Sequence, residues 1–494
     1  MELKFISQIR KGNNRGTGFI CLPKGKADSL ILDDWVRTEL SENIYFLSKI
    51  ISYSHRQGVY VPKNIVVENN LLNKKTKIQI KKIDGFYAPV GSDGRVYIPY
   101  DVVKSESLHR NKIVSIKAMD NNKVIQEKYV KIYVSRRPER KREEFICYVD
   151  KNLSGRTLVF QIEKLSRIPQ NGEMDPIVTK LLQGTHYAFI GKNSVIIFKG
   201  NKVPAIINTS LKLLEIAFYI GAYFADGTKK GNSWAICAST FEQAKYYLKI
   251  HNLLIKDSKP EFTISYTNIY NIDHNNLKRD LAKIWQKEVS IKVNKFRIRK
   301  PTGKSITKWN KYGTLIIREH RQILLDIYNA LIESLINEIL FRKDKKLAID
   351  FICGVMEGDG CASATKRGHV MIFANKDDTQ PLEKILKVAQ IKFKVNKEGK
   401  NKYSLRIGAL EILRNFCLLK DKIFILYPRR RKNLFERLKT VGAIKFLAGN
   451  HQPTSWVKSW LKNNGFCDKN YKITGSGLNV SNVILKEIQK AGVK

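Results

Sequence analysis

The sequence predicts an α+β fold in three parts, and three patterns indicate it. Residues 1–205 contain short β-branched runs separated by Gly, Asn and Asp turns, which is typical of a β-rich domain. Between residues 206 and 445, an apolar helix, a strand, a second helix and further strands occur twice in the same order. Residues 446–494 have mainly helical periodicity, which favours a small helical C-terminal domain.

The bulk composition indicates a polyanionic partner. The 494 residues include 89 Lys and Arg against 45 Asp and Glu, a net charge of +44, which opposes compaction unless a polyanion binds. Nucleic acid is the expected polyanion, because no run of about 18 apolar residues predicts a membrane span. The N-terminal segment lacks an apolar signal core, so we expect a cytoplasmic, DNA-associated protein. The seven scattered cysteines favour a reducing compartment and argue against a zinc site.

The strand-rich region also contains a dense basic run between Val134 and Glu144. A solvated loop and a phosphate-contacting segment both explain this run, and the sequence leaves both open. Given the overall charge, we expect the domain of residues 1–205 to contact DNA. The basic residues of the run are Arg136, Arg137, Arg140, Lys141 and Arg142.

The two tandem copies define the domains 206–343 and 344–445. In the first, we expect Asn208 to Ser210 to cap an apolar helix that ends near Ala225, and residues 256–285 to form an insertion. Its other elements are a strand (Trp234 to Ala238), a helix (Phe241 to Leu254), a strand (Ile291 to Ile298) and a long helix (about Arg318 to Leu340). The second copy has a helix (Leu347 to Met356), a strand (His369 to Phe373), a helix (Pro381 to Ala389), a hairpin (Ile391 to Ile407) and a helix (Leu410 to Leu419). Such a repeat suggests two halves of one monomer packed about a pseudo-twofold axis.

The first helix of each copy ends in a similar nonamer, YIGAYFADG at residues 219–227 and ICGVMEGDG at residues 352–360. Small residues four apart lie on one face of a helix, so these two faces can pack backbone to backbone. A packing role also explains glycine inside a helix, where it costs about 1 kcal/mol. The small residues are Gly221, Ala225, Gly354 and Gly358.

Both nonamers end in Asp-Gly, which predicts a helix end with the glycine in the left-handed conformation. Asp226 and Asp359 would then lie at the negative ends of two helix dipoles, and they would converge if the helices pack side by side. Two such carboxylates need a divalent cation to stay ionised. Oxygen ligands beside a phosphate substrate favour Mg²⁺.

The paired nonamers resemble the signature of the LAGLIDADG homing endonucleases in their single-chain, two-repeat form. The resemblance covers residues 206–445 and implies two αββαββα-type repeats that form a pseudo-twofold saddle on double-stranded DNA. It also implies that Asp226 and Asp359 bind Mg²⁺ (or Mn²⁺ in its place) at the scissile phosphates, and that both strands are cut to leave short 3′ overhangs. Glu357 is not a metal ligand in this pattern, and we expect it at the rim of its helix.

The resemblance extends to peripheral active-site positions. Lys229, three residues beyond Asp226, fits a basic position of the family, whereas the matching residue after Asp359 is Ala362. Lys376 falls where the family often has a polar or basic pocket residue. We therefore count Lys229 and Lys376 as candidate catalytic residues, with a surface or DNA-backbone contact as the alternative for each.

Alternating strands predict the DNA-binding surface. In the hairpin of the second copy, polar residues alternate with apolar ones, which places its cations on one face. The first copy has a similar alternation around Phe296 and Ile298. A basic sheet face suits the major groove, although an ordinary solvated face has the same pattern. The predicted DNA-binding residues are Lys392, Lys394, Lys402 and Arg406 in one copy and Lys295, Arg297 and Arg299 in the other.

The C-terminal part provides further basic candidates. Arg429, Arg430 and Arg431 begin a basic helix that we expect to lie on phosphate. Residues 446–494 resemble a helix-turn-helix, with a helix after Thr454 and a last helix from Ser481. Asn482 and Lys486 lie on the face that a recognition helix presents. A helical cap over the preceding domain is the alternative.

Three functions remain open at this stage. The leading one is a Mg²⁺-dependent, site-specific DNA endonuclease, since both acidic positions are present. The same scaffold also occurs in non-cleaving DNA-binding transcriptional regulators and in RNA-splicing maturases. An intein is disfavoured, because the chain begins with Met1 and ends in Val493-Lys494, and we expect a freestanding protein. Abundant Lys, Ile and Asn are typical of an AT-rich genome and suggest an archaeal source.

Overall fold

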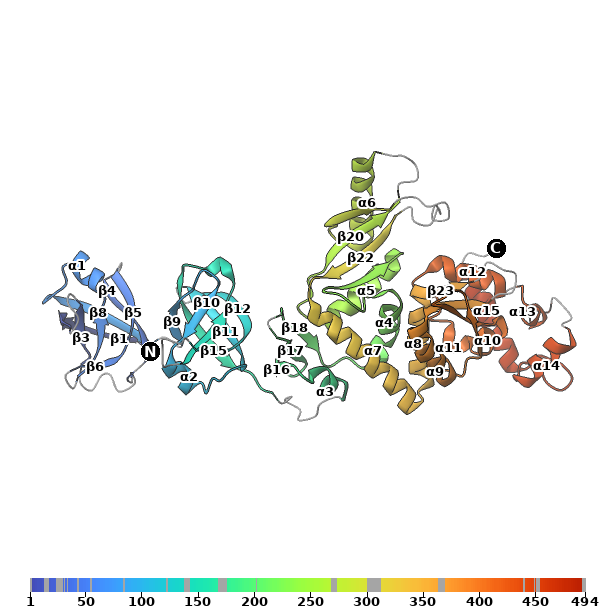
Figure 1. Ribbon diagram of the computed structural model, residues 1–494, viewed down its shortest axis with the longest axis horizontal. Helices are drawn as coiled ribbons and strands as arrows, with labels where there is room; N and C mark the ends of the chain where they lie inside the picture. Colours follow the sequence, from blue (N-terminus) through green and yellow to red (C-terminus); the bar gives the residue numbers. More distant parts are fainter. Residues whose placement is uncertain are drawn as a thin grey trace. The chain divides into compact units, whose positions relative to one another are not determined.

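The computed structural model has an α+β fold with several small sheets (Figure 1). It describes residues 2–490 except for 13–16, 24–29, 31, 33, 42–43, 54–55, 83–84, 121–122, 137–142, 168–175, 201, 268–272, 300–311, 363–368, 439, 448 and 450–453. The basic run predicted near residue 140 therefore lies largely outside the described residues. The chain forms two compact units, residues 1–168 with 186–190 and residues 169–185 with 191–494.

The first unit contains two separate hydrophobic cores. Fully buried side chains from two antiparallel sheets, β1-β8-β4-β5 and β2-β3-β7-β6, fill the first core. These residues include Ile20, Val36, Val59 and Ile80. The elements here are β1 (Glu2–Gln8), β2 (Arg10–Lys11), β3 (Gly18–Cys21), β4 (Trp35–Ser41), β5 (Ile44–Lys49), β6 (Ile51–Tyr53), β7 (Arg56–Val61), α1 (Lys63–Glu68) and β8 (Lys75–Lys82).

The second core lies between the sheets β12-β11-β15-β9 and β10-β14-β13. Phe86 and Phe160 are fully buried in it, with ring centroids 5.6 Å apart. The β-branched runs at Arg95–Ile98 and Thr157–Lys164 both form strands of these sheets. The elements are β9 (Phe86–Pro89), β10 (Arg95–Ile98), α2 (Tyr100–Ser105), β11 (Ile113–Asp120), β12 (Lys123–Lys131), β13 (Tyr133–Arg136), β14 (Glu143–Tyr148), a 3₁₀ turn (Lys151–Leu153), β15 (Thr157–Lys164) and β16 (His186–Phe189).

The second unit begins with a short helix and a hairpin, and then contains two helix-and-sheet halves. In the first half the strand order is β19-β22-β20-β21, with β21 parallel to β20. The elements are α3 (Pro176–Leu182), β17 (Ser194–Phe198), β18 (Ala205–Asn208), α4 (Leu213–Asp226), β19 (Trp234–Ala238), α5 (Phe241–Leu254), β20 (Glu261–Tyr266), α6 (His274–Val289), β21 (Lys295–Ile298), β22 (Thr314–Glu319) and α7 (Gln322–Arg342).

In the second half the strand order is β23-β24-β26-β25, and all its pairs are antiparallel. The elements are α8 (Lys345–Asp359), β23 (Gly360–Ala362), β24 (Val370–Asn375), α9 (Lys376–Val388), β25 (Phe393–Lys397), β26 (Lys402–Ile407), α10 (Ala409–Arg414) and α11 (Phe416–Leu419). Helices α4 and α8 run side by side between the two sheets (Figure 1). The unit ends with α12 (Pro428–Leu438), α13 (Gly442–Leu447), α14 (Ser455–Asn463) and α15 (Gly475–Lys490).

The strand order corrects how we matched the two copies. The antiparallel triple β24-β26-β25 corresponds to β19-β22-β20, so the partner of β25 is β20 and not the strand near residue 295. Residues 261–266 are therefore an integral strand, so the insertion begins after Tyr266 and extends further along the chain than the expected 256–285. The additional elements of the first half are α6 and the edge strand β21.

Several helix starts also differ from the prediction. Asn208 ends β18 and caps no helix; α4 begins after Lys212, whose backbone N–H donates to Glu215 Oε2 at 2.7 Å. The long helix begins at Gln322 and not near Arg318, because residues 314–319 form β22. Helix α9 begins at Lys376 and not at Pro381, because the Asn375 side chain caps it. The last helix begins at Gly475 rather than Ser481, because Thr474 Oγ1 accepts from the Gly477 N–H at 3.2 Å.

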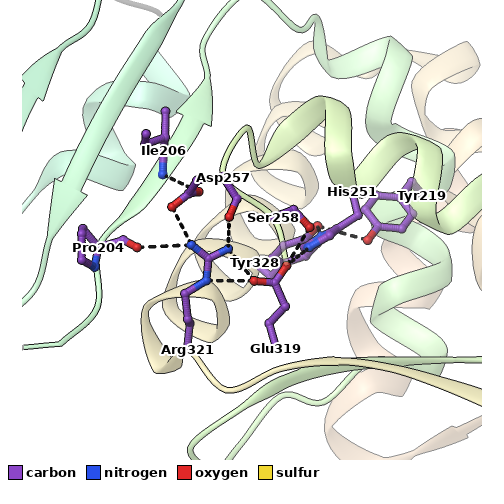
Figure 2. Close-up of polar contacts among 9 residues, drawn as sticks. All are labelled: Pro204, Ile206, Tyr219, His251, Asp257, Ser258, Glu319, Arg321 and Tyr328. Atoms are coloured by element: carbon purple, nitrogen blue, oxygen red, sulfur yellow. Dashed lines mark hydrogen bonds and ion pairs between the residues drawn. The ribbon is translucent and has the colours of Figure 1, made fainter. Parts of the chain in front are cut away.

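A buried polar network fixes the β17–β18 hairpin to the first half (Figure 2). Arg321 donates to Asp257 Oδ2 at 2.7 Å, to Glu319 Oε2 and to the Pro204 carbonyl, and Asp257 accepts from the Ile206 N–H. Burial opposes ionisation of Glu319, but His251, Arg321 and Ser258 outweigh it and hold its pKa well below the usual range.

The same network continues into the aromatic core through His251. Burial lowers the pKa of His251, so the neutral ring donates from Nε2 to Glu319 and accepts at Nδ1 from the Tyr328 hydroxyl, both at 2.7 Å. Its ring also stacks on Trp234, with centroids 3.9 Å apart. The network is therefore fully satisfied and has a structural role.

Among the described residues, no helix is both long and apolar enough to cross a membrane.

Candidate active site

The glycines of the two nonamers allow α4 and α8 to touch through their backbones. A Cβ atom on Gly221 would lie 2.1 Å from the Phe351 carbonyl oxygen, and one on Gly354 would lie 1.9 Å from that of Phe218. A Cβ on Gly358 would lie 2.7 Å from the Cβ of Ala225. The structure therefore brings together all four small residues that the sequence singled out at this interface.

The same packing brings Asp226 and Asp359, the last residues of α4 and α8, to one place. A Cβ on Gly358 would lie only 2.7 Å from Asp226 Oδ2. Burial raises the pKa of Asp226 to about 6. Burial also raises the pKa of Asp359 to about 7, and the charge of Asp226 adds to this shift. The two carboxylates are thus close, largely buried and mutually repulsive.

Both helices end without the expected left-handed glycine. Gly227 has φ −86° and ψ 154°, and Gly360 has φ −79° and ψ 145°, which is extended backbone. The chain passes directly from each helix into β structure, since Gly227 bridges to Ile236 and β23 starts at Gly360. Glycine is required for space instead, because a Cβ at either position would lie 2.2–2.4 Å from a helix carbonyl oxygen, that of Tyr223 or Met356.

Lys229 follows α4 in the sequence, but its side chain interacts with acidic residues of the second half. Its ammonium lies 4.0 Å from the centroid of the Phe224 ring and pairs with Asp378 Oδ2 at 2.8 Å. Its charge lowers the pKa of Asp359. Asp378 is a third carboxylate that the sequence reasoning missed; the capping pattern Asn375-x-x-Asp378 was the available signal, because an acidic third residue is typical of a helix start. Lys376 is exposed at the first position of α9.

Glu357 is fully buried, which corrects its predicted place at the helix rim. Its Oε1 atom accepts from the Leu426 N–H at 3.1 Å, and Oε2 has no hydrogen-bond partner among the described residues. Burial raises the pKa of Glu357 to about 8. It is buried because the segment before α12 crosses the end of α8 and contacts α5, where Thr240 Oγ1 donates to the Leu426 carbonyl at 2.6 Å. Sequence periodicity alone contains no signal for this crossing.

Arg430 and Arg431 have their guanidinium groups engaged within the protein, which differs from the phosphate contact that we expected. Arg430 Nη1 donates to the carbonyls of Met356, Glu357 and Gly358, the last at 2.9 Å, and so caps the end of α8. Its charge lowers the pKa values of both Asp226 and Asp359. Arg431 donates to the carbonyls of Ile423 and Lys420. Arg429 is half-buried.

The strand register places several predicted DNA contacts on one sheet face. Lys394 lies directly opposite Arg406, and Arg406 lies opposite Met371 on its other side. Lys402, four residues before Arg406 on β26, lies on the same face. Lys392 is exposed just before β25. In the first half, Lys295 and Arg297 lie opposite Thr263 and Ser265 on the outer face, and Arg299 Nε donates to Ser265 Oγ at 2.6 Å. In the second half, Lys402 and Arg406 thus lie on the inner strand β26 and Lys394 on the edge strand β25, whereas the cations of the first half lie on or just after the added edge strand β21.

The outer face of the first sheet borders the carboxylates. Cys237 on β19 lies on that face, opposite Ile316, because the preceding residue Ile236 points into the core and successive side chains of a strand alternate between faces. The charges of Asp226, Arg299 and Arg318 all act on its thiol, whose pKa is raised mainly by burial. A ligand on this sheet face would therefore adjoin Asp226.

The C-terminal helices form a small separate group within the second unit. Asn482 and Lys486 are exposed on α15, while Ile484 is buried, as the predicted helix face requires. Residues 464–474 join α14 to α15, and this connection is longer than the turn of three or four residues in a helix-turn-helix. Trp456 on α14 is 64% exposed.

The paired carboxylates suit a divalent cation chemically. Aspartate oxygens are hard ligands, and a cation would offset the burial and repulsion that raise both pKa values. No group of three or more His, Cys, Asp and Glu side chains placed to hold a metal occurs in the described part of the chain. Two carboxylates completed by water and phosphate oxygens correspond to the usual coordination of Mg²⁺.

Comparison with known proteins finds structural similarity at low sequence identity. No protein-family model and no curated protein matches the chain. Among solved structures, it is similar to a variant of I-DmoI in complex with nicked target DNA and Mn, with 14% identity, a TM-score of 0.22, and coverage of 44% of this chain and 98% of that one. A second I-DmoI variant, with target DNA and Mg, gives 15% identity, a TM-score of 0.21, and 43% and 97% coverage. Mesophilic variants of the homing endonuclease I-DmoI give 13% identity, a TM-score of 0.21, and 43% and 96% coverage. Similarity at this level carries no argument about function.

Proposed function

We propose that this chain is a site-specific double-strand DNA endonuclease of the LAGLIDADG homing type. It would hydrolyse phosphodiester bonds with Mg²⁺ and leave short 3′ overhangs, with Asp226 and Asp359 as the metal-binding carboxylates. In this assignment, residues 206–343 and 344–445 are the two repeats of a monomeric pseudo-twofold saddle. Residues 1–205 would be an additional DNA-contacting domain, and residues 446–494 a helix-turn-helix-like one.

One observation carries this proposal. Two helices with glycine-rich faces pack so closely that their terminal carboxylates meet at a single point, although burial and repulsion oppose their ionisation there. A purely structural role does not require acids at this position, because asparagine or serine would fill the same space without charge. A function that needs two negative charges together accounts for them.

Different residues of the site would bind the metal ion, keep its ligands charged and fix the distance between them. Asp226 and Asp359 would hold the ion, which when bound activates water and stabilises the leaving oxygen of a phosphodiester. Arg430 and Lys229 favour the charged form of the carboxylates. The backbone contact between α4 and α8 fixes the distance between the two acids, because no side chain separates the helices at Gly221 and Gly354.

The basic faces of the two sheets would form the path of the duplex. The outer face of the first sheet adjoins Asp226 through Cys237, and its cations include Arg297, Arg299 and Arg318. In the second sheet, Lys394 on β25 and Arg406 on β26 lie opposite each other on the corresponding face. Phosphate contacts along both faces would place the DNA backbone over the two carboxylates.

The decisive experiment selects cleaved molecules from a random duplex library incubated with the full chain and Mg²⁺, since the target is unknown. We expect a defined cut site with 3′ overhangs, and loss of cleavage in Asp226→Asn and in Asp359→Asn. Asp280→Asn, on the exposed surface of α6, is the matched control and should cleave normally. Binding with Ca²⁺ but no cleavage with Mg²⁺ would favour a transcriptional regulator. Tighter binding of folded intron RNA than of any duplex would favour a maturase.

A further inference from the structure

One face of the β10-β14-β13 sheet in the first unit carries tyrosines and cations side by side. Arg95 lies directly opposite Tyr148, while Tyr97 and Tyr133 lie opposite Ile146 from its two sides. Residues opposite one another, or two apart on one strand, lie on the same face. The other face, with Val96 and Cys147, belongs to the hydrophobic core.

The side chains of this face, together with Lys131 at the end of β12, form a continuous series of aromatic and cationic groups. Arg95 Nη1 donates to the Tyr97 hydroxyl at 3.4 Å, and its guanidinium lies 5.9 Å from the centroid of Tyr148. Tyr148 and Tyr133 meet edge to face at 5.5 Å, and Lys131 Nζ lies 4.9 Å from the Tyr133 ring. We call these five residues the tyrosine ladder: Tyr97, Arg95, Tyr148, Tyr133 and Lys131. Arg95 also pairs with Asp93 at 3.1 Å.

The Lys131 end of the ladder continues into a cluster of positive charge. Burial lowers the pKa of Lys131, and the charge of Arg110 lowers it further. The pKa of His186 is lowered by burial and by the charges of Lys131 and Arg167. The pKa of Lys112 is lowered by burial and by the charges of Lys164 and Arg167, and the charge of Glu106 partly offsets this shift. Cations this close repel one another, so an anion that binds among them stabilises the arrangement.

The combination of rings and cations identifies the ligand. A duplex presents phosphates but keeps its bases stacked on one another, so partly exposed tyrosine rings gain nothing from it. An unpaired strand offers both phosphates and free base faces, and the pairing of stacking rings with a positive track is how single strands are bound without sequence preference. Tyr97, at the outer end, is 37% exposed, so its ring is accessible.

We propose that the tyrosine ladder and the adjoining cations Arg110 and Arg167 form a binding site for single-stranded DNA. Bases stack on the tyrosine rings, and the phosphates pair with Arg110 and Arg167, which are exposed, whereas Lys131 is buried beside Tyr133. The site is independent of the carboxylate pair and adds a second nucleic-acid contact to the chain. It does not depend on the proposed nuclease activity.

The test measures binding of fluorescein-labelled oligo(dT) of about 15 nucleotides to the full chain by anisotropy, with unlabelled duplex DNA as competitor. We expect Tyr97→Ala and Tyr133→Leu each to weaken binding about tenfold, as loss of one stacked base predicts. Tyr97→Phe keeps the ring and should retain binding. Arg110→Gln should weaken binding and reduce its salt dependence.

Matched controls come from the same subdomain. Tyr129 on β12 lies among Glu127 and Glu163, and Lys123 lies at the opposite end of β12 from Lys131, so Tyr129→Ala and Lys123→Gln should leave oligo(dT) binding unchanged. Circular dichroism melts identify variants that have lost their fold, and Tyr97→Ala, at an exposed site, keeps the test decisive if Tyr133→Leu unfolds.

Three results would overturn the proposal. They are full binding by Tyr97→Ala together with Arg110→Gln, equal competition by duplex and single strand, and tighter binding of oligo(rU) than of oligo(dT). Loss of cleavage in Asp226→Asn with oligo(dT) binding intact leaves the site standing, so failure of the nuclease and failure of this site are distinguishable.

Discussion

Lys229 reaches from the end of α4 to Asp378 at the start of α9, and its Nζ atom lies 2.8 Å from Asp378 Oδ2. The contact joins a residue of the first half of the second unit to a residue of the second half. Although Lys229 follows Asp226 in the sequence, its charge acts on Asp359. The basic position after the first nonamer therefore supports the carboxylate of the second.

Replacing either member of this pair should shift the pH dependence of cleavage in opposite directions. Lys229 lowers the pKa of Asp359 and Asp378 raises it. Lys229→Met should therefore move the acidic limb of the pH–rate profile to higher pH, because more Asp359 is protonated at a given pH. Asp378→Asn should move it to lower pH. Shifts in the same direction would show that the pair acts through folding alone.

Glu357→Gln should stabilise the protein at high pH only. The pKa of Glu357 is about 8 in the folded state, well above its ordinary value of 4.5. The stability that the protonated side chain contributes is therefore complete below the unfolded pKa and is lost as the pH rises through about 8. Because one pKa unit corresponds to about 1.4 kcal/mol, the cost of the buried carboxylate at pH 9 is on the order of a few kcal/mol. Thermal melts in EDTA should show a higher Tm for the variant at about pH 9 and no gain at about pH 5. An equal difference at both pH values would refute the assignment.

Gly354→Ala tests the backbone contact of α4 and α8. A Cβ there would lie 1.9 Å from the Phe218 carbonyl oxygen and 2.9 Å from the Ala222 nitrogen, so the helices must separate. We expect a loss of about 3 kcal/mol in the free energy of unfolding, and cleavage that stays impaired at temperatures where the variant is folded. Gly408→Ala is the control, because a Cβ there meets nothing within 4 Å and its φ of −70° suits alanine. Its stability should change by less than about 0.5 kcal/mol.

The spacing of apolar residues correctly predicted those helices and strands that bury one regular face. The strand Trp234–Ala238 and the helix Phe241–Leu254 match their predicted bounds, because a capping Thr240 and a one-sided apolar stripe mark them. The nonamers marked the ends of α4 and α8 for the same reason. Strand β22 was missed because apolar Ile316 lies on the partly exposed face between the buried Leu315 and Ile317, so the run lacks the apolar–polar alternation of a half-buried strand.

Contacts between residues far apart in the sequence determine the strand pairing and the position of Arg430, which local patterns did not predict. The alternation of Lys295, Phe296 and Arg297 identifies a strand, but only pairing shows that this strand is an added edge next to β20. A run of arginines likewise looks the same on a solvated face and beside a helix end. Arg430 is internal because the chain before α12 crosses the end of α8, a tertiary event without a local signal. Helix propensity and charge pattern therefore found the carboxylates and missed the groups that control them.

Arg430→Gln should impair metal-dependent cleavage beyond its effect on stability. The guanidinium caps the carbonyls at the end of α8 and lowers the pKa values of Asp226 and Asp359. Its loss should raise both pKa values, weaken Mn²⁺ binding at pH 7 and move the acidic limb of the cleavage profile to higher pH. Arg431→Gln removes comparable carbonyl contacts and should lower Tm without this shift. Arg430→Lys should restore part of the activity; equal pH profiles for the two glutamine variants would contradict a role in the site.

The salt dependence of duplex binding tests the proposed DNA-binding face of the second sheet. Lys394 and Arg406 lie opposite each other on its outer face, whereas Lys397 on the same strand has the opposite parity. If both outer cations contact phosphates, Lys394→Gln and Arg406→Gln should each reduce the slope of log K against log salt by about 1. Lys397→Gln removes the same charge from β25 and should leave the slope unchanged. Binding measured with Ca²⁺ keeps the DNA intact and separates this effect from cleavage. Equal slopes for all three variants would mean that the net charge of +44 attracts DNA without this face contacting it.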